Sequence, residues 1–216
     1  MAGGAITADD GLERALRARL GRAARICGVD EAGRGPWAGP VHAAAVIFAP
    51  GEAPAGLADS KTLSAARRAA LAEAIKASAA GWAVAFASVE EIDAMGVGRA
   101  ADLAMCRAVG ALGAVAAALV DGNRLPRGLP CPGEAAVGGD ARSVSIAAAS
   151  ILAKTVRDAV MDDLDAEAPV YGWARNRGYG TPEHAAALAR YGVTQHHRRS
   201  FRPIHKILVE GGSIST

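Results

Sequence analysis

Four short apolar runs lie between residues 25 and 120, each rich in Val, Ile or Ala and bounded by Gly, Pro, Asp or Ser. They span residues 25–29, 41–48, 82–87 and 117–120. Apolar runs of this length with turn residues at both ends are typical of buried strands. We therefore expect four strands, the first two forming an antiparallel hairpin at the start of the sheet.

Apolar residues at helical spacing lie between these runs and after them. Helices are expected at residues 64–78, 99–112, 145–164 and 181–191. Ser64 is a candidate N-cap of the first helix, and Thr181 and Pro182 supply an N-cap and a first-turn proline for the last. Strands that alternate with helices after an antiparallel start predict an α/β fold, with a mixed central sheet flanked by helices.

The length of 216 residues suits a single domain that buries most of its apolar surface. Neither an internal repeat nor a linker divides the chain. The expected organisation is an N-terminal tail with a short helix over residues 1–24, one domain over 25–210 whose part from about 169 is a small helical extension, and a flexible tail over 211–216.

The sequence favours a reducing, aqueous compartment. The longest apolar run, residues 111–120, is far shorter than the roughly 20 residues that span a bilayer. The N-terminus has no apolar segment of the kind found in a secretory signal. Cys27, Cys106 and Cys131 have neither a disulfide-framework nor a zinc-site spacing, and we expect them to be reduced packing residues. We expect a cytoplasmic monomer without a membrane partner.

Charge is distributed unevenly along the chain. The net charge of +2 does not by itself identify a polyanionic partner. Between Tyr171 and Lys206, however, seven Lys and Arg side chains stand against one acid, Glu183, together with four of the five His. This segment is either a solvated charged face or a surface that contacts phosphate.

Acidic residues recur beside glycine at the ends of apolar strands. Asp30 and Glu31 follow the first predicted strand, and Asp121 follows the fourth. Asp140 comes after two glycines and before the helix predicted at 145–164. Because α/β proteins gather their sites at one edge of the sheet, we expect all four carboxylates to approach the same edge.

Four carboxylates without a cationic partner in the same motifs repel one another, which raises their pKa values and destabilises the fold unless cations bind. Oxygen-only ligands favour Mg²⁺ or Mn²⁺. Two such ions about 4 Å apart can hold an attacking water and a leaving oxygen on one phosphodiester. Phosphodiester hydrolysis is the reaction class that this pattern favours. On spacing alone the alternative stays open, because a single Asp at a strand end is often a turn or cap residue.

Gly33 and Gly35 come two and four residues after Glu31. Neighbours on a regular strand point to opposite faces, so Asp30 and Glu31 can reach one centre only if the chain bends, and these glycines would supply the bend. Residues 33–38 also satisfy GxGxxA, the relaxed fingerprint of a dinucleotide-binding turn. That motif opens a helix, whereas here the chain leads into the next strand, so a nucleotide-cofactor enzyme is the distant alternative.

Five long motifs occur in the order found in bacterial ribonuclease HII, and they cover most of residues 26–201. They are GVDEAGRGPWAGPVHAAAVIF, LADSKTLSAARR, LVDGNRLP, GGDARSVSIAAASILAKTVRD and GYGTPEHAAALARYGVTQHHRRSF. The chain thus closely resembles this family. The resemblance implies a ribonuclease H-like fold with an extra C-terminal helical segment. It further implies endonucleolytic cleavage of RNA paired with DNA, including single ribonucleotides embedded in duplex DNA, with 3′-hydroxyl and 5′-phosphate product ends.

The resemblance also implies the catalytic residues. The acids that match the family motifs, and that would hold two divalent ions during catalysis, are Asp30, Glu31, Asp121 and Asp140. An Asp at position 140, rather than Glu, is more similar to ribonuclease HII than to its relative ribonuclease HIII. The main alternative is a catalytically silent module that binds RNA–DNA hybrids on the same fold, and the four intact acids argue against it.

Further residues match family positions that contact nucleic acid. The backbone of the GRG segment is associated with reading the ribose 2′-hydroxyl, which separates RNA from DNA. A tyrosine stacks on the sugar beside the cleavage junction, with ordinary packing as the alternative, and two lysines lie near the nucleic-acid backbone. The substrate-binding candidates are Gly33, Arg34, Gly35, Lys61, Lys154 and Tyr179.

One segment departs from the family pattern. Gly96 and Val97 stand where the family usually has an Asn-Ile pair, whose amide helps to hold backbone phosphate. Arg99 is a candidate substitute for that amide. Arg198 and Arg199 either contact phosphate or brace the sheet, and the sequence does not distinguish these roles.

Overall fold

The computed structural model describes residues 8–58, 60 and 63–211 of the chain. The strands in this part are β1 (Ile26–Ala32), β2 (Val41–Ile47), β3 (Gly81–Ala87), β4 (Ala117–Asp121) and β5 (Gly133–Ala136). They form one mixed sheet with the order β3-β2-β1-β4-β5. β1 and β3 pair antiparallel with β2, whereas β4 pairs parallel with β1 and with β5. The predicted mixed sheet with an antiparallel start is confirmed.

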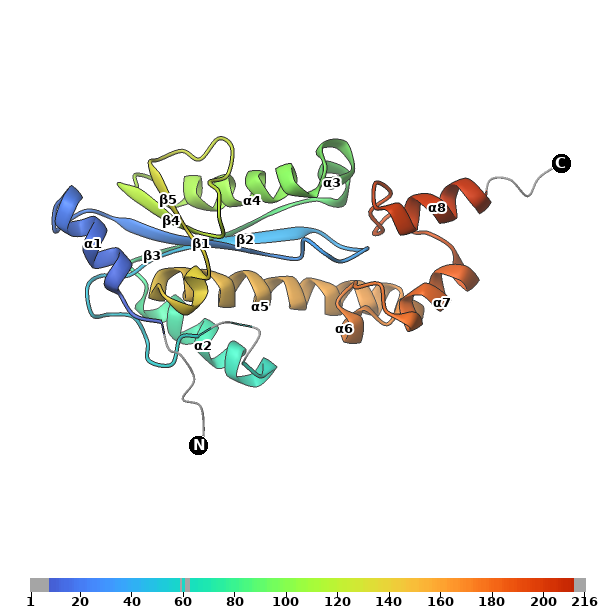
Figure 1. Cartoon of the computed structure of the whole chain (residues 1–216). Helices are drawn as coiled ribbons and strands as arrows, with labels where there is room; N and C mark the ends of the chain where they lie inside the picture. The colour runs from blue at the N-terminus through green and yellow to red at the C-terminus, as the bar shows by residue number, and fades with distance from the viewer. Residues whose placement is uncertain (1–7, 59, 61–62, 212–216) are drawn as a thin grey trace, which may run out of the picture.

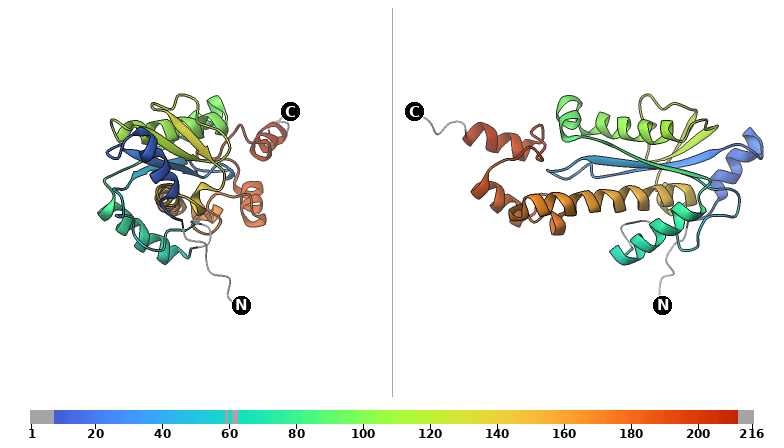
Figure 2. Two further views of the ribbon diagram at one scale, coloured as in Figure 1. Left: turned by 60° about the vertical axis from the view of Figure 1, so that its left-hand side comes forward. Right: turned by 180° about the vertical axis from the view of Figure 1, so that it is seen from behind.

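Helices cover both faces of this sheet. They are α1 (Gly11–Leu20), α2 (Ala65–Ser78), α3 (Val89–Met95), α4 (Val97–Ala111), α5 (Val144–Glu167), α6 (Trp173–Asn176), α7 (Pro182–Tyr191) and α8 (Arg202–Gly211). α4 lies on one face, and α2 and the long helix α5 lie on the other (Figures 1 and 2). α5 continues past the end of the sheet, and α6, α7 and α8 lie there, where a helical extension was predicted (Figure 1).

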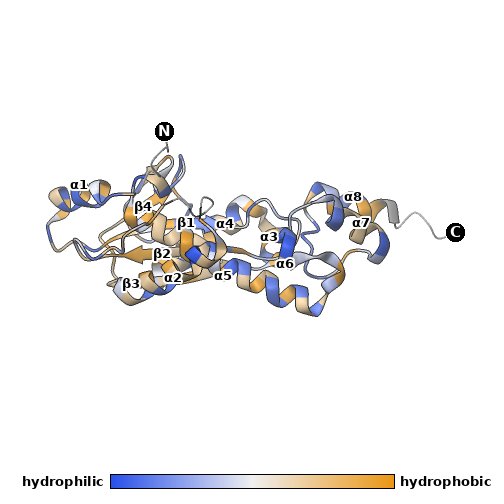
Figure 3. Ribbon diagram, turned by 90° about the horizontal axis from the view of Figure 1, so that it is seen from below, coloured by the Kyte–Doolittle hydropathy of each residue, from blue (hydrophilic) through white to orange (hydrophobic). Residues whose placement is uncertain are grey.

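The apolar run of β2 is continuous because both faces of the sheet are covered. Val41, Ala43 and Ala45 pack in the core on the α4 side, whereas Ala44 and Val46 pack in the core that contains residues of α2 and α5. All seven residues of β2 are buried. The strands are apolar in the middle of the molecule and the outer helices carry mixed colours (Figure 3). No helix in the described residues is long and apolar enough to cross a membrane.

Small residues let α5 approach the sheet closely. A Cβ atom at Gly28 of β1 would collide with the backbone of Ser145 and Ile146 in the first turn of α5. The same helix is rich in buried alanine along the sheet. The missing side chain at Gly28 therefore allows the start of α5 to lie against β1, two residues before Asp30.

Most predicted elements are confirmed, with small shifts at their ends. Ser64 accepts a hydrogen bond from the N–H of Arg67 and caps α2, and Thr181 caps α7 in the same way. α3 was not predicted, although Ser88 and Glu91 form a capping box that the sequence displays. β5 was also missed, because its residues GEAA have no apolar pattern. Apart from Gly211, the tail expected at 211–216 lies outside the described residues.

Candidate active site

A cavity of about 420 Å³ opens where β1 and β4 end beside α5. Carboxylates, cationic side chains and one tyrosine surround it. Its lining residues are Asp30, Glu31, Ala32, Gly33, Ser60, Arg68, Asp121, Ser150, Lys154, Arg157 and Tyr179. The cavity thus brings together three of the predicted acids and three of the substrate-binding candidates.

The acid pair lies inside β1, not after its end as the sequence suggested. Asp30 and Glu31 stay in regular register with β2, opposite Ala44 and Ala43. The pairing of β1 with β4, however, stops at Val29. Both acids therefore reach the cavity from regular strand, where β1 continues beyond its pairing with β4, and the chain leaves the strand at Gly33 only after the pair.

Asp30 is the most buried of these acids, with 7% of its surface exposed. Burial raises its pKa well above the usual range, and the nearby charges of Glu31 and Asp121 raise it further. One of its oxygens accepts the N–H of Glu31 at 2.7 Å. Burial and the neighbouring carboxylates therefore favour the protonated form of Asp30 in the metal-free protein, and a bound cation would favour its carboxylate form.

Asp121 ends β4, and its Oδ1 accepts the N–H of Gly139 at 2.7 Å. That bond ties β4 to the short 3₁₀ turn Gly139–Ala141, which contains Asp140. Asp140 is thus close in the chain to a group that contacts Asp121, but it does not line the cavity. Three of the four predicted acids line the cavity, and the assignment of Asp140 to the same metal site stays a prediction.

The donor set fits a hard divalent cation. The three carboxylates on the cavity and the Ser150 hydroxyl supply oxygen atoms only, which Mg²⁺ and Mn²⁺ prefer. Their side chains are not arranged as a closed cage: no group of three or more His, Cys, Asp or Glu residues within the described ranges has metal-site geometry. Glu31 turns to Arg34, 3.2 Å away, and Asp121 turns to Gly139. These separate partners keep the two carboxylates apart and so reduce their mutual repulsion. A bound cation would instead draw both carboxylates toward itself.

A cluster of ion pairs lies at the cavity, where Arg68 and Lys154 are among the lining residues. Lys154 Nζ lies 2.6 Å from Asp158, which Arg68 also contacts at 3.3 Å. Arg68 donates in addition to the carbonyls of Ser60 and Leu63. The sequence reasoning named only Lys154 here. Polar residues recur at positions 150, 154 and 157 of the Ala-rich α5. This helical spacing indicates that one face of the helix borders a polar site. The other predicted lysine, Lys61, lies outside the described residues.

Tyr179 stands at the cavity beside the glycine-rich segment. Its side chain is 49% exposed, so it is not a core residue, and packing does not account for its position. A Cβ atom at Gly35 would lie 3.2 Å from the tyrosine ring. The segment Gly33–Gly35 continues into β2 without a helix, which removes the dinucleotide-binding interpretation of its glycines.

The chain was compared with known proteins and solved structures. The family model of ribonuclease HII matches residues 27–204. A ribonuclease HII of Paracoccus denitrificans is 60% identical over 184 residues, covering 85% of this chain and 87% of that protein. The chain belongs to the ribonuclease HII family. It is therefore a ribonuclease H, an endonuclease of a family that acts on nucleic acid and depends on divalent metal ions.

Solved structures of ribonucleases H share its fold. Ribonuclease H2 from Pyrococcus horikoshii superimposes with a TM-score of 0.74 at 22% identity, covering 88% of this chain and 99% of that one. Bst-RNase HIII in complex with Mn²⁺ superimposes with a TM-score of 0.67 at 20% identity, covering 89% of this chain and 71% of that one. The predicted ribonuclease H-like fold is confirmed.

In this member of the ribonuclease HII family, part of the basic C-terminal segment is internal. His184 and His197 are buried and their Nε2 atoms lie 3.0 Å apart. Burial lowers the pKa of His197 to about 3, and also lowers that of His184, so both are neutral at pH 7. Arg198 is fully buried, which excludes it as a surface phosphate contact. The phosphate-binding surface suggested by the charge count is accordingly smaller than the sequence indicated.

The region that departs from the family pattern lies away from the cavity lining. Gly96 has a φ of 82° and separates α3 from α4, a conformation that glycine adopts easily. Arg99 lies instead in a hollow with Asp102 and Arg127. Whether Arg99 replaces the usual amide stays a prediction.

Proposed function

We propose that this enzyme cleaves the RNA strand of RNA–DNA hybrids and nicks duplex DNA at single embedded ribonucleotides, leaving 3′-hydroxyl and 5′-phosphate ends. The observation that carries the proposal is the convergence of Asp30, Glu31 and Asp121 on a cavity shared with Gly33 and Tyr179. The carboxylates would take part in hydrolysis. The backbone at Gly33 and the ring of Tyr179 would recognise a sugar. The proposal includes Asp140 as the fourth acid, carried over from the family motif.

Divalent cations, Mn²⁺ or Mg²⁺ and two in number, would be held by Asp30, Glu31, Asp121 and Asp140. When bound they would lower the pKa of water and stabilise charge on the leaving 3′-oxygen. The Mn²⁺ in Bst-RNase HIII, which shares the fold, supports this choice of ion. The protein contributes the close approach of Asp30, Glu31 and Asp121, whose mutual repulsion a bound cation would relieve.

Substrate choice would come from the other residues at the cavity. The backbone of Gly33, Arg34 and Gly35 is proposed to read the 2′-hydroxyl. The half-exposed ring of Tyr179 would stack on the adjoining sugar, and Lys154 would approach the phosphates. Phosphate contacts of this kind make affinity sensitive to salt. The expected monomeric state and cytoplasmic location stay predictions.

A nicking assay tests the proposal. A labelled DNA duplex with one ribonucleotide is incubated with Mn²⁺, with Mg²⁺ or with EDTA, and the expected result is a single nick that requires metal. Absence of a metal-dependent nick, with binding retained, would favour the silent hybrid-binding module instead.

Asp140→Asn tests the acid that does not line the cavity. We expect the variant to bind the duplex and to lose most cleavage, because the family motif assigns this residue to catalysis. Asp163→Asn is the matched control, since Asp163 lies exposed on α5 away from the cavity. Cleavage by Asp140→Asn at the rate of the control would remove Asp140 from the catalytic set.

A further inference from the structure

Two buried arginines converge on the carbonyl groups of the segment Gly33–Pro40. Arg157 of α5 is 1% exposed and Arg198 is 0% exposed. Arg157 donates to the carbonyls of Pro40, Ala38 and Arg177 at 3.1 to 3.3 Å. Arg198 donates to the carbonyls of Gly33 at 2.6 Å, Gly39 at 2.9 Å, Arg34 at 3.0 Å and Pro40 at 3.2 Å.

These guanidinium groups are held by backbone oxygen and not by acids. Within the described residues, neither Arg157 nor Arg198 forms an ion pair with Asp or Glu. Burial lowers the pKa of Arg157 to about 10 and that of Arg198 to about 9, so both stay charged at pH 7. A buried cation is costly unless its donors are satisfied, and here the oxygens that satisfy them belong mainly to one loop.

The arginines decide how that loop presents its backbone. Carbonyls that point to the guanidinium groups leave the peptide N–H groups on the other side. The N–H groups of Gly33, Arg34 and Gly35 have no protein acceptor among the described residues. Gly33 has a φ of 97°, and a Cβ atom there would collide with the side chain of Arg157. The loop is therefore packed against Arg157 and Arg198, and its N–H groups remain available to a ligand.

The segment around Arg198 ties the same loop to the tyrosine. The N–H of Arg198 donates to the carbonyl of Trp37 at 2.8 Å, and the N–H of Trp37 donates to Gly178 at 2.7 Å. Arg157 contacts the carbonyl of Arg177, one residue before Gly178. Both elements proposed to read the sugar are thus connected through Arg157 and Arg198.

We infer that Arg157 and Arg198 are positioning residues for recognition of the ribose 2′-hydroxyl. They hold carbonyls of the segment Gly33–Pro40 inward, and because those of Gly33 and Arg34 are among them, the N–H groups of Arg34 and Gly35 are left to the substrate. The inference rests on the proposed function and adds the residues on which its sugar readout depends. Arg198 does not line the cavity, and Arg157, which does, donates to backbone carbonyls, so we assign both an action through the backbone of the loop.

The test is binding preference, measured with Ca²⁺ in place of Mg²⁺ so that the duplex is held without being hydrolysed. The preference is the Kd of an all-DNA duplex divided by the Kd of the same duplex with one ribonucleotide. Arg198→Lys keeps the charge but loses the planar fork. We expect the preference to fall about tenfold, as the loss of charge-assisted hydrogen bonds allows, while the Kd of the all-DNA duplex stays unchanged.

Arg157→Lys is the second variant, in case Arg198→Lys does not fold. Arg190→Lys is the matched control, because Arg190 lies exposed on α7 and is remote from the loop. Amide hydrogen exchange of the peptide covering residues 33–40 is measured in parallel. If the two arginines hold the loop, amide hydrogen exchange in residues 33–40 is faster in Arg157→Lys and Arg198→Lys than in the wild type. Exchange in the control stays at the wild-type rate.

The outcomes separate the inference from the proposed function. A wild-type enzyme without any preference for the ribonucleotide would overturn both. Preference that is present in the wild type and retained in both lysine variants would overturn the inference alone. Equal losses of affinity for the two duplexes, together with a lower melting temperature, would indicate a purely structural role and would also overturn it.

Discussion

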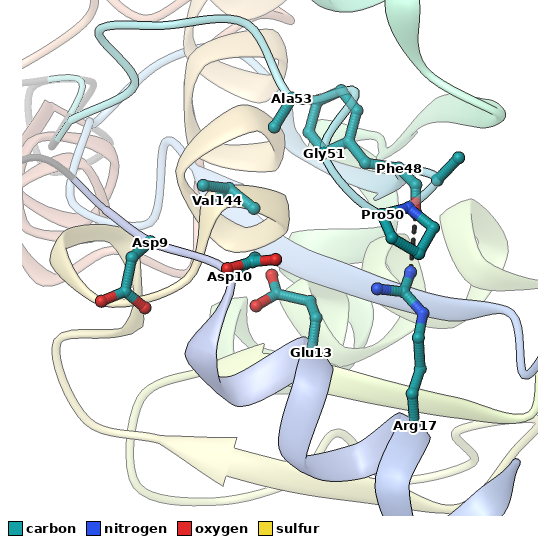
Figure 4. Close-up of a pocket in the computed structure, with 10 residues that line it drawn as sticks. Asp9, Asp10, Glu13, Arg17, Phe48, Pro50, Gly51, Ala53 and Val144 are labelled. Atoms are coloured by element: carbon teal, nitrogen blue, oxygen red, sulfur yellow. Dashed lines mark hydrogen bonds between the residues drawn. The ribbon is translucent and has the colours of Figure 1, made fainter. Parts of the chain in front are cut away.

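Glu13 of α1 makes a strong prediction about stability. Its carboxylate is 3% exposed and points from α1 toward the first residues of α5 (Figure 4). Oε1 accepts hydrogen bonds from Ser143 Oγ at 2.6 Å, Ser145 Oγ at 2.5 Å and Ser145 N at 3.0 Å. Oε2 is buried without a partner among the described residues. A single anion therefore closes the N-terminus of α5, where the helix dipole favours negative charge.

Glu13→Ala would remove this acceptor from three buried donors. A hydrogen bond to a charged group contributes roughly 1.5 to 3 kcal/mol, but the three share one oxygen and are not additive. Ser143 Oγ and Ser145 Oγ lie 3.2 Å apart, so the hydroxyls can pair with each other. The N–H of Ser145 has no such replacement. We expect Glu13→Ala to lower the free energy of unfolding by about 3 kcal/mol.

Urea denaturation followed by circular dichroism measures this loss. Glu134→Ala is the control, because Glu134 forms an exposed pair with Arg19 at 2.7 Å, and such pairs contribute less than about 1 kcal/mol. Glu13→Gln should fall between the two variants, since the amide keeps one acceptor and places a donor at the unpartnered oxygen position. A loss for Glu13→Ala no greater than that for Glu134→Ala would refute the reasoning.

Three further predictions concern Asp30, Gly180 and Cys27. Because the folded pKa of Asp30 is raised above its usual 3.8, the folded state retains a proton that the unfolded state releases, and stability without metal declines as pH rises above about 4. In thermal scans at pH 7 in EDTA, Asp30→Asn should therefore have a higher melting temperature than the wild type, and Mn²⁺ should raise that temperature less than it does in the wild type. A lower melting temperature than the wild type in EDTA contradicts this. Gly180→Ala should cost about 1 to 3 kcal/mol in urea unfolding, because its Cβ would enter the ring of Trp37; an unchanged midpoint contradicts this. Burial raises the pKa of Cys27 to about 12, so mass spectrometry should find it unmodified by iodoacetamide at pH 8 until urea is added; labelling of the folded protein contradicts this.

Local patterns predicted much of the fold. The continuous apolar run of residues 41–48 required a strand covered on both faces, and β2 is buried throughout. The caps at Ser64 and Thr181 marked helices whose starts the structure reproduces. β5 could not be predicted, because a strand at the sheet edge with one buried residue of four follows from pairing with β4 and not from its own pattern.

The candidate site was predictable in its composition and less so in its geometry. Acids at Asp30, Glu31 and Asp121 were expected together, and they line one cavity. The place of Asp140 beside the cavity depends on the turn that follows Gly138, which has a φ of 63°. Arg68 and Asp158 were missed, since they are 90 positions apart in the chain and meet only after α2 packs near α5.

Short motifs and periodic burial were enough to identify the family, most of the helices and strands, and the chemistry available to them. They left Arg198 between phosphate contact and brace, and the folded chain buries its side chain. Its guanidinium contacts carbonyls from 158 to 165 positions away. Burial and backbone partners at such separation arise from packing of the whole chain, and no local pattern encodes them.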